Sequence, residues 1–193
     1  MITQLKGKLV EKSPTEVVVD CNGVGYLAHI SLHTYSKLPK DENVTLYTYL
    51  SIREDAHVLF GFADKLEREI FKLLISVSGV GPSTARTMLS SMNSEEIQHA
   101  IASENVKTIQ SVKGIGAKTA QRVIVDLKDK VLKVFQLDEI SAPISNTFKD
   151  EALSALEVLG FNKKQSEKVV NAILAEEPNA SVENIIKSAL KKL

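Results

Sequence analysis

A short segment built around two glycines occurs twice in this chain. The first copy, SVSGVGPSTARTML, runs from Ser76 to Leu89, and the second, SVKGIGAKTAQRVI, runs from Ser111 to Ile124. Apolar residues at helical spacing lie on both sides of each Gly-aliphatic-Gly sequence. Because glycine adopts positive φ without steric cost, each copy predicts two helices joined by a bend too tight for other residues.

Each bend is expected to expose backbone amides at the start of a helix. We expect Val80 and Ile115, which lie between the glycines, to point inward and hold the two helices together. Pro82 suits the first position of a helix, where its missing N–H is no loss. The free N–H groups and the positive end of the helix dipole then form an anion site, most naturally for a phosphate.

The better-known phosphate loops do not match these bends. Gly116-Ala117-Lys118-Thr119 lacks the Gly-Lys-Ser/Thr sequence of a Walker A loop. Thr84 and Thr119 stand where a dinucleotide fingerprint has its third glycine, and a helix precedes each bend instead of a strand. The sequence therefore excludes ATP and NAD from the bends, and we expect no cofactor.

Repetition of the bend favours DNA as the ligand. A single bend is as often a plain connection, but two bends form a pair with approximate two-fold symmetry, so that each can bind the phosphates of one duplex strand. Residues 63–135 hold 11 Lys and Arg against 8 Asp and Glu, although the whole chain has a net charge of zero. The candidate DNA-binding residues are Gly79, Val80, Gly81, Ser83, Thr84, Arg86, Lys113, Gly114, Ile115, Gly116, Lys118, Thr119 and Arg122.

Residues 1–63 have the pattern of a small β-barrel. Asn22-Gly23 suits a turn with positive φ between two strands. Five short strands are the number found in a Greek-key barrel of the OB-fold type. The expected strands are Ile2–Glu11, Thr15–Cys21, Val24–Ser31, Asn43–Ile52 and His57–Phe62.

The remaining chain divides into a helical domain, a linker and a second helical domain. Residues 64–135 carry the all-α pair of hairpins, and residues 136–147 mix acidic residues, serines and a proline, which is typical of a linker. Residues 148–193 predict a three-helix bundle with helices at about Lys149–Leu159, Lys163–Glu176 and Val182–Lys192. The fold class is therefore a multidomain chain with separate β and α parts.

The composition indicates the cellular environment of the chain. Cys21 is the single cysteine, so no internal disulfide forms. No stretch reaches the roughly 18 apolar residues of a membrane helix, and the first residues lack the apolar core of a signal peptide. We expect a soluble, cytoplasmic protein with no membrane contact.

A catalytic function is the alternative of a different class. A hairpin-type glycosylase or nuclease needs a base or clustered metal ligands near the hairpins. Asp126 and Asp129 follow the second hairpin, but their spacing on a Lys-rich helix fits solvated ion pairs. The four histidines are scattered along the chain. We therefore expect no catalytic residue and no metal site, and a general duplex-binding adaptor stays open as a further alternative.

The doubled segment resembles the helix-hairpin-helix pair, and the whole chain resembles the RuvA family. The order of barrel, hairpins, linker and terminal bundle matches that family. Three further motifs carry the resemblance: GVGY at Gly23–Tyr26, REDAHVLFGF at Arg53–Phe62 and LGF at Leu159–Phe161.

This resemblance implies a non-catalytic scaffold for four-way (Holliday) junctions. RuvA-like proteins form homotetramers that hold the junction open and planar and recruit the hexameric ATPase RuvB for branch migration in recombination and repair. One or two tetramers per junction are both open, and the family leaves room for the junction resolvase RuvC as a further partner.

Two groups of residues take roles from the resemblance alone. Glu54 and Asp55 match the acidic pin at the junction centre, although such a pair is most often a solvated turn. The terminal bundle is UBA-like and contacts the ATPase, with Leu156, Leu159 and Phe161 as candidates for an exposed apolar patch. Burial of these three residues in the core of the bundle is an equal alternative.

Overall fold

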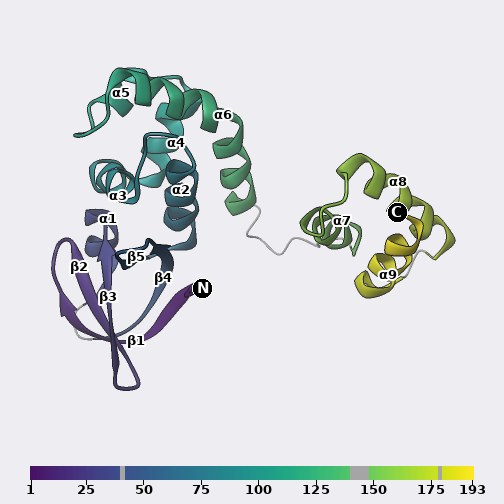
Figure 1. Ribbon diagram of the computed structural model, residues 1–193, viewed down its shortest axis with the longest axis horizontal. Helices are drawn as coiled ribbons and strands as arrows, with labels where there is room; N and C mark the ends of the chain where they lie inside the picture. The colour runs from purple at the N-terminus through teal and green to yellow at the C-terminus, as the bar shows by residue number, and fades with distance from the viewer. Residues whose placement is uncertain (40–41, 140–147, 178–179) are drawn as a thin grey trace. The chain divides into compact units, whose positions relative to one another are not determined.

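The chain forms two compact units, Met1–Glu139 and Ile140–Leu193. A computed structural model describes residues 1–39, 42–139, 148–177 and 180–193, with side chains placed outside residues 132–139 (Figure 1). The first unit contains a β-barrel and a helical region, and the second contains three helices. Each unit is described separately below.

The first unit begins with the predicted five-stranded barrel. Its strands close in the order β1-β2-β3-β5-β4, and β3 pairs with β5 in parallel while the other pairs are antiparallel. Asn22 and Gly23 form the β2–β3 turn with φ values of 55° and 89°, as predicted. The OB-type barrel expected from the sequence is therefore confirmed. The strands are β1 (Gln4–Lys12), β2 (Glu16–Cys21), β3 (Val24–Ile30), β4 (Asn43–Ile52) and β5 (His57–Phe62).

A short helix in the barrel was not expected from the sequence. Helix α1 (Leu32–Lys37) follows β3, and the Ser31 hydroxyl caps it by accepting the Thr34 N–H. Six residues are too few to show clear helical spacing, so the sequence pattern contained no signal for this element.

The helical region carries both hairpins. Its helices are α2 (Lys65–Ile75), α3 (Pro82–Ser91), α4 (Ser94–Ala102), α5 (Val106–Gln110) and α6 (Ala117–Glu139). Helices α2 and α3 form the first hairpin, α5 and α6 form the second, and α4 connects them. Helix α6 extends four residues beyond Phe135, so the expected linker start at Gln136 is wrong. The rest of the expected linker, residues 140–147, lies outside the described residues.

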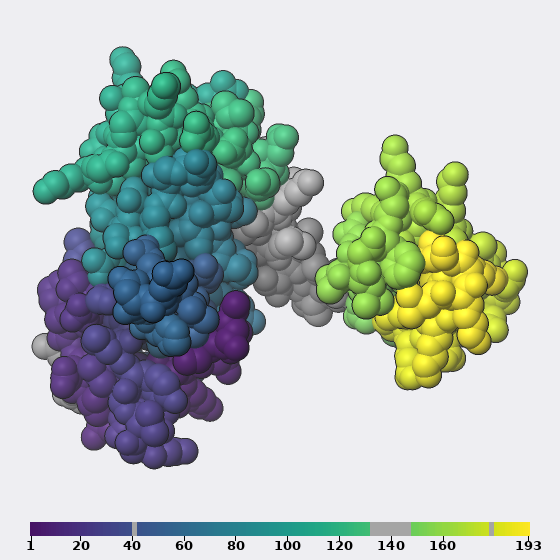
Figure 2. Space-filling view, viewed as in Figure 1, coloured from purple at the N-terminus to yellow at the C-terminus, as the bar shows by residue number. Residues whose placement is uncertain are grey.

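Aromatic packing joins the barrel to the helices. The Phe71 ring of α2 is 5.1 Å from that of Phe60 and 5.0 Å from that of Phe62, measured between ring centroids, and Tyr49 lies 5.4 Å away. Each such pair contributes about 0.5–1.5 kcal/mol beyond the burial of its surface. The same buried cluster continues into both hairpins, and Figure 2 shows barrel and helices as one continuous body.

A buried carboxyl group forms a second connection between barrel and helices. Glu67 of α2 is fully buried and accepts hydrogen bonds from the Ser31 hydroxyl and, at 2.6 Å, from the Thr34 hydroxyl. Thr34 Oγ1 in turn accepts the Ala63 N–H at 3.0 Å. Burial raises the pKa of Glu67, and the two hydroxyl donors offset part of that rise.

The second unit is the predicted three-helix bundle. Its helices are α7 (Phe148–Val158), α8 (Lys163–Glu176) and α9 (Val182–Lys192), within one residue of the expected bounds. Apolar residues from all three helices form its core, including Leu153, Val170 and Ile185.

We expect Glu67→Gln to change how stability depends on pH. The raised pKa means that the folded chain binds the Glu67 proton more tightly than the unfolded chain does. The free energy of unfolding of the wild type therefore falls as the pH rises from about 4.3, the ordinary pKa of glutamate, toward the raised value. Glutamine keeps polar contacts but does not titrate, so the stability of the variant relative to wild type should increase over this range.

Chemical denaturation of both proteins between about pH 4 and about pH 8 measures this difference. A difference that stays constant with pH would contradict the assignment.

Candidate nucleic-acid interface

Two bends with the same backbone geometry connect the hairpin helices. The first bend comprises residues 76–81 and the second comprises residues 111–116. Gly79 has a φ of 96° and Gly114 a φ of 92°. Side chains rarely adopt this left-handed region, so the positive φ explains why glycine occupies both positions.

The aliphatic residue of each bend is buried, as predicted. Val80 and Ile115 are each 5% exposed and belong to the core shared by the hairpins and the base of the barrel. The Val80 N–H donates to the Val77 carbonyl at 3.0 Å, and the Ile115 N–H donates to the Val112 carbonyl at 3.1 Å. Any contact of Val80 or Ile115 with a ligand would therefore run through the main chain.

The helix starts after the bends offer free amides. Gly81 is the N-cap of α3, with extended backbone and no side-chain cap, and Pro82 follows at the first helical position. Gly116 accepts the Ala120 N–H at the start of α6. The first N–H groups of a helix have no acceptor within it. In the described part of the chain, the N–H groups of Gly81 and Gly116 and of the residues at the second and third helical positions, Ser83, Thr84, Lys118 and Thr119, donate no hydrogen bond.

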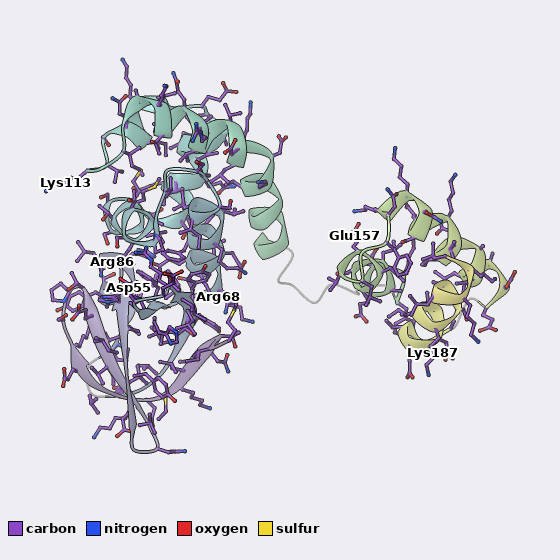
Figure 3. The ribbon with its side chains drawn as sticks, viewed as in Figure 1. Asp55, Arg68, Arg86, Lys113, Glu157 and Lys187 are labelled. Carbon is purple, nitrogen blue, oxygen red and sulfur yellow. The ribbon has the colours of Figure 1, made fainter. Side chains whose placement is uncertain are left out.

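The two lysines of the second hairpin are exposed and available for an anion. Lys113 and Lys118 make no hydrogen bond or ion pair within the described residues. Figure 3 shows Lys113 extending outward at the edge of the helical region. Of the hydroxyl residues in the predicted set, Ser83 is exposed, and Thr84 and Thr119 are half-buried.

The two arginines of the predicted set already have partners. Arg86 Nη1 donates to the Thr15 carbonyl of the barrel at 3.3 Å. Arg122 Nη1 donates to the Ser78 carbonyl of the first bend at 3.1 Å. Both acceptors are main-chain atoms distant in sequence, so no sequence pattern could have indicated these contacts.

The two bends are neighbours in space. A Cβ atom at Gly79 would lie 3.5 Å from Thr119 Oγ1, which belongs to the first turn of α6. Together with the Arg122–Ser78 bond, this contact brings the start of α6 against the first bend. The structure therefore places two sets of free amides side by side on one unit.

The acidic pair lies in a tight turn of the barrel. Glu54 and Asp55 are exposed between β4 and β5, and the Arg53 N–H closes the turn on the Ala56 carbonyl at 2.9 Å. Figure 2 shows this part of the chain, in blue, on the face turned toward the viewer. Exposed negative charges repel a phosphate backbone, and the exposed Arg53 beside this pair adds one positive charge to the turn.

The apolar patch expected on the terminal bundle needs a correction. Leu156 is fully buried in the core of the bundle, so its assignment to an exposed patch is wrong. Leu159 is 57% exposed, and Phe161 is partly buried against the core. Val158, which the sequence analysis missed, is 86% exposed. Its position two residues after Leu156 places it off the buried face, and helical spacing could have indicated this.

Neither a cluster of possible metal ligands nor a membrane-spanning helix occurs among the described residues. No group of three or more His, Cys, Asp or Glu side chains gathers in them. None of the described helices combines the length and apolar character needed to cross a bilayer. Asp126 and Asp129, the carboxylates considered for catalysis, are both exposed.

Comparison with known proteins assigns the family. The description "RuvA N terminal domain" matches residues 1–61, "SAM-like Helix-hairpin-helix tandem" matches residues 71–129, and "RuvA, C-terminal domain" matches residues 148–193. A relative from Christiangramia forsetii, named Holliday junction branch migration complex subunit RuvA, is 65% identical over all 193 residues and the full length of both chains. The chain belongs to the RuvA family.

Further family members carry the same name. The RuvA subunit of Flavobacterium psychrophilum is 65% identical, and that of Bacteroides thetaiotaomicron is 52% identical, each over the full length of both chains. In this RuvA-family chain the matched tandem segment includes both bends and their helix starts.

We expect Gly114→Ala to destabilise the first unit. No atom lies within 4 Å of a Cβ built on Gly114, so the cost comes from the positive φ alone, about 1–2 kcal/mol. The control is Gly81→Ser, because Gly81 has ordinary φ, open space around its Cβ position and a helix-capping role that serine fills well. Urea unfolding measures both, and equal losses of stability would contradict the argument.

Proposed function

We propose that this chain is the DNA-binding subunit of a Holliday junction branch migration complex and has no catalytic activity of its own. The observation that carries the proposal is the pair of adjacent glycine bends with free amides at two helix starts. The name printed for its full-length relatives supports the same role. A general duplex-binding adaptor would use the same bends but would not prefer a four-way junction.

In this proposal the bends bind phosphates on opposite strands of a duplex arm. The main-chain amides of Gly79, Gly81, Gly114 and Gly116, with those of Ser83, Thr84, Lys118 and Thr119, provide directional donors, and Lys113 and Lys118 provide charge. Such contacts position the protein on DNA without reading its sequence. Affinity should therefore depend steeply on salt, because phosphate contacts release counterions.

Assembly of four chains would match the number of arms in a four-way junction. A homotetramer would present four pairs of hairpins, one for each arm, with the acidic turns of Glu54 and Asp55 near the crossover to repel misplaced strands. One or two tetramers then hold the junction open in the cytoplasm, where the resolvase RuvC is a further candidate partner.

The terminal bundle is the proposed contact for the ATPase. Branch migration needs a motor, and a hexameric RuvB-type ATPase in a separate chain is the partner that the family implies. Val158 and Leu159 expose apolar surface at the end of α7, and Phe161 lies beside them in sequence. Exposed apolar residues that are adjacent in this way mark candidate protein contacts.

Serine at the two helix starts should lower junction affinity without lowering the stability of the fold. In Gly81→Ser and Gly116→Ser, the hydroxyl would cap the helix by accepting a first-turn N–H, which removes that amide from the phosphate. A hydrogen bond to a charged group contributes about 1.5–3 kcal/mol, so junction affinity should fall at least about tenfold, with stability kept. Gel shifts of a four-way junction and of a linear duplex of equal length measure affinity and preference.

Unchanged junction affinity in both serine variants would contradict amide binding. Equal affinity of the wild type for junction and duplex would favour the adaptor. Strand incision or base release in the same reactions would favour an enzyme.

Neutralising the acidic turn should reduce discrimination and leave the fold intact. Glu54→Gln together with Asp55→Asn removes two exposed negative charges whose repulsion of phosphates disfavours misplaced DNA. We expect the ratio of junction to duplex affinity to fall by about threefold to tenfold. Glu11→Gln, an exposed glutamate elsewhere on the barrel, is the control. The pin assignment fails if the double variant and the control give the same ratio.

A further inference from the structure

The second hairpin contacts the first bend, whereas the Cβ position of Gly114 in the second bend has open space around it. Arg122 of α6 donates to the Ser78 carbonyl at 3.1 Å, and Thr119 Oγ1 lies 3.5 Å from the Cβ position of Gly79. On the opposite side of the repeat, a Cβ at Gly114 meets no atom within 4 Å. Two copies of the same motif therefore differ in the contacts around their first glycine.

The arginine of the first hairpin makes an analogous contact with the barrel. Arg86 donates to the Thr15 carbonyl, in the loop between β1 and β2. Arg86 and Arg122 stand one position apart in the aligned copies, and each joins its own helix to a part of the chain that precedes its hairpin. Arg86 links the first hairpin to the barrel, and Arg122 links the second hairpin to the first.

We propose that Arg122 is a positioning residue that holds the first bend against α6, and that it is not a phosphate ligand. This inference rests on the proposed DNA-binding function. Amides on two bends can bind two DNA strands only if the distance between the bends is fixed. The Arg122–Ser78 bond and the Thr119 contact both hold the first bend against α6 and so fix this distance. The charge that pairs with phosphates comes from Lys113 and Lys118, which are exposed and unpaired within the described residues.

The salt dependence of DNA affinity distinguishes a residue that binds phosphate from a residue that only positions the bend. Each neutralised phosphate contributes about 0.9 to the slope of log affinity against log salt concentration. Loss of a residue that binds phosphate therefore lowers the slope. Loss of a hydrogen bond within the chain instead lowers DNA affinity by a similar factor at every salt concentration.

The test compares Arg122→Gln with the matched control Lys118→Gln in the full chain on a four-way junction. Glutamine is too short to reach the Ser78 carbonyl and carries no charge. We expect Arg122→Gln to lower affinity about tenfold with the slope unchanged. Lys118→Gln should lower the slope by about 0.9 for each copy that contacts the junction. Arg122→Lys, which keeps a donor of nearly the same reach, should recover part of the affinity.

Amide hydrogen exchange of the free protein provides a second measurement that needs no DNA. Releasing the first bend should raise exchange at the Val80 N–H about tenfold in Arg122→Gln, with wild-type exchange in Lys118→Gln. Wild-type exchange in Arg122→Gln, or a drop in slope equal to that of Lys118→Gln, would overturn the inference. Because exchange is read without DNA, it decides the positioning role even if junction binding is absent, and that absence would instead overturn the proposed function.

Discussion

Burial of one aliphatic side chain in each glycine bend is the constraint on which the proposed DNA interface depends. Val80 and Ile115 are held in the common core, so the residues on either side of them must turn outward. Gly79 and Gly114 permit that turn through positive φ. Burial of the apolar residue between the glycines therefore leaves the amides at the following helix starts exposed.

The same core sets where the hairpins lie on the barrel. Phe71 packs against aromatic residues of β4 and β5, and Glu67, four residues earlier on α2, takes hydroxyl hydrogen bonds from Ser31 and from α1. Apolar packing supplies most of the stability, whereas the directional hydrogen bonds select one orientation. The acidic turn of the barrel and the bends of the helical region are consequently parts of one body.

The structure differs from the sequence-based expectation at two helices and at one side chain. Helix α1 is too short for its spacing to be seen, and α6 continues into residues whose polar composition is typical of a linker. Leu156 was a candidate for the exposed patch with burial in the bundle core as the equal alternative, and it lies in that core. The burial of Leu156 depends on how the three helices of the bundle pack, which local composition alone does not contain.

The sequence by itself determined the strands of the barrel, both bends, the three terminal helices and the family resemblance. Turn chemistry and hydrophobic spacing act between residues close in the chain, so they can be recognised without a structure. Only the tertiary structure decided that the bends are neighbours, that Glu67 is buried between barrel and helices, and that the arginines already have partners. The Arg122–Ser78 bond joins residues 44 positions apart, and such a contact exists only after the intervening helices have packed.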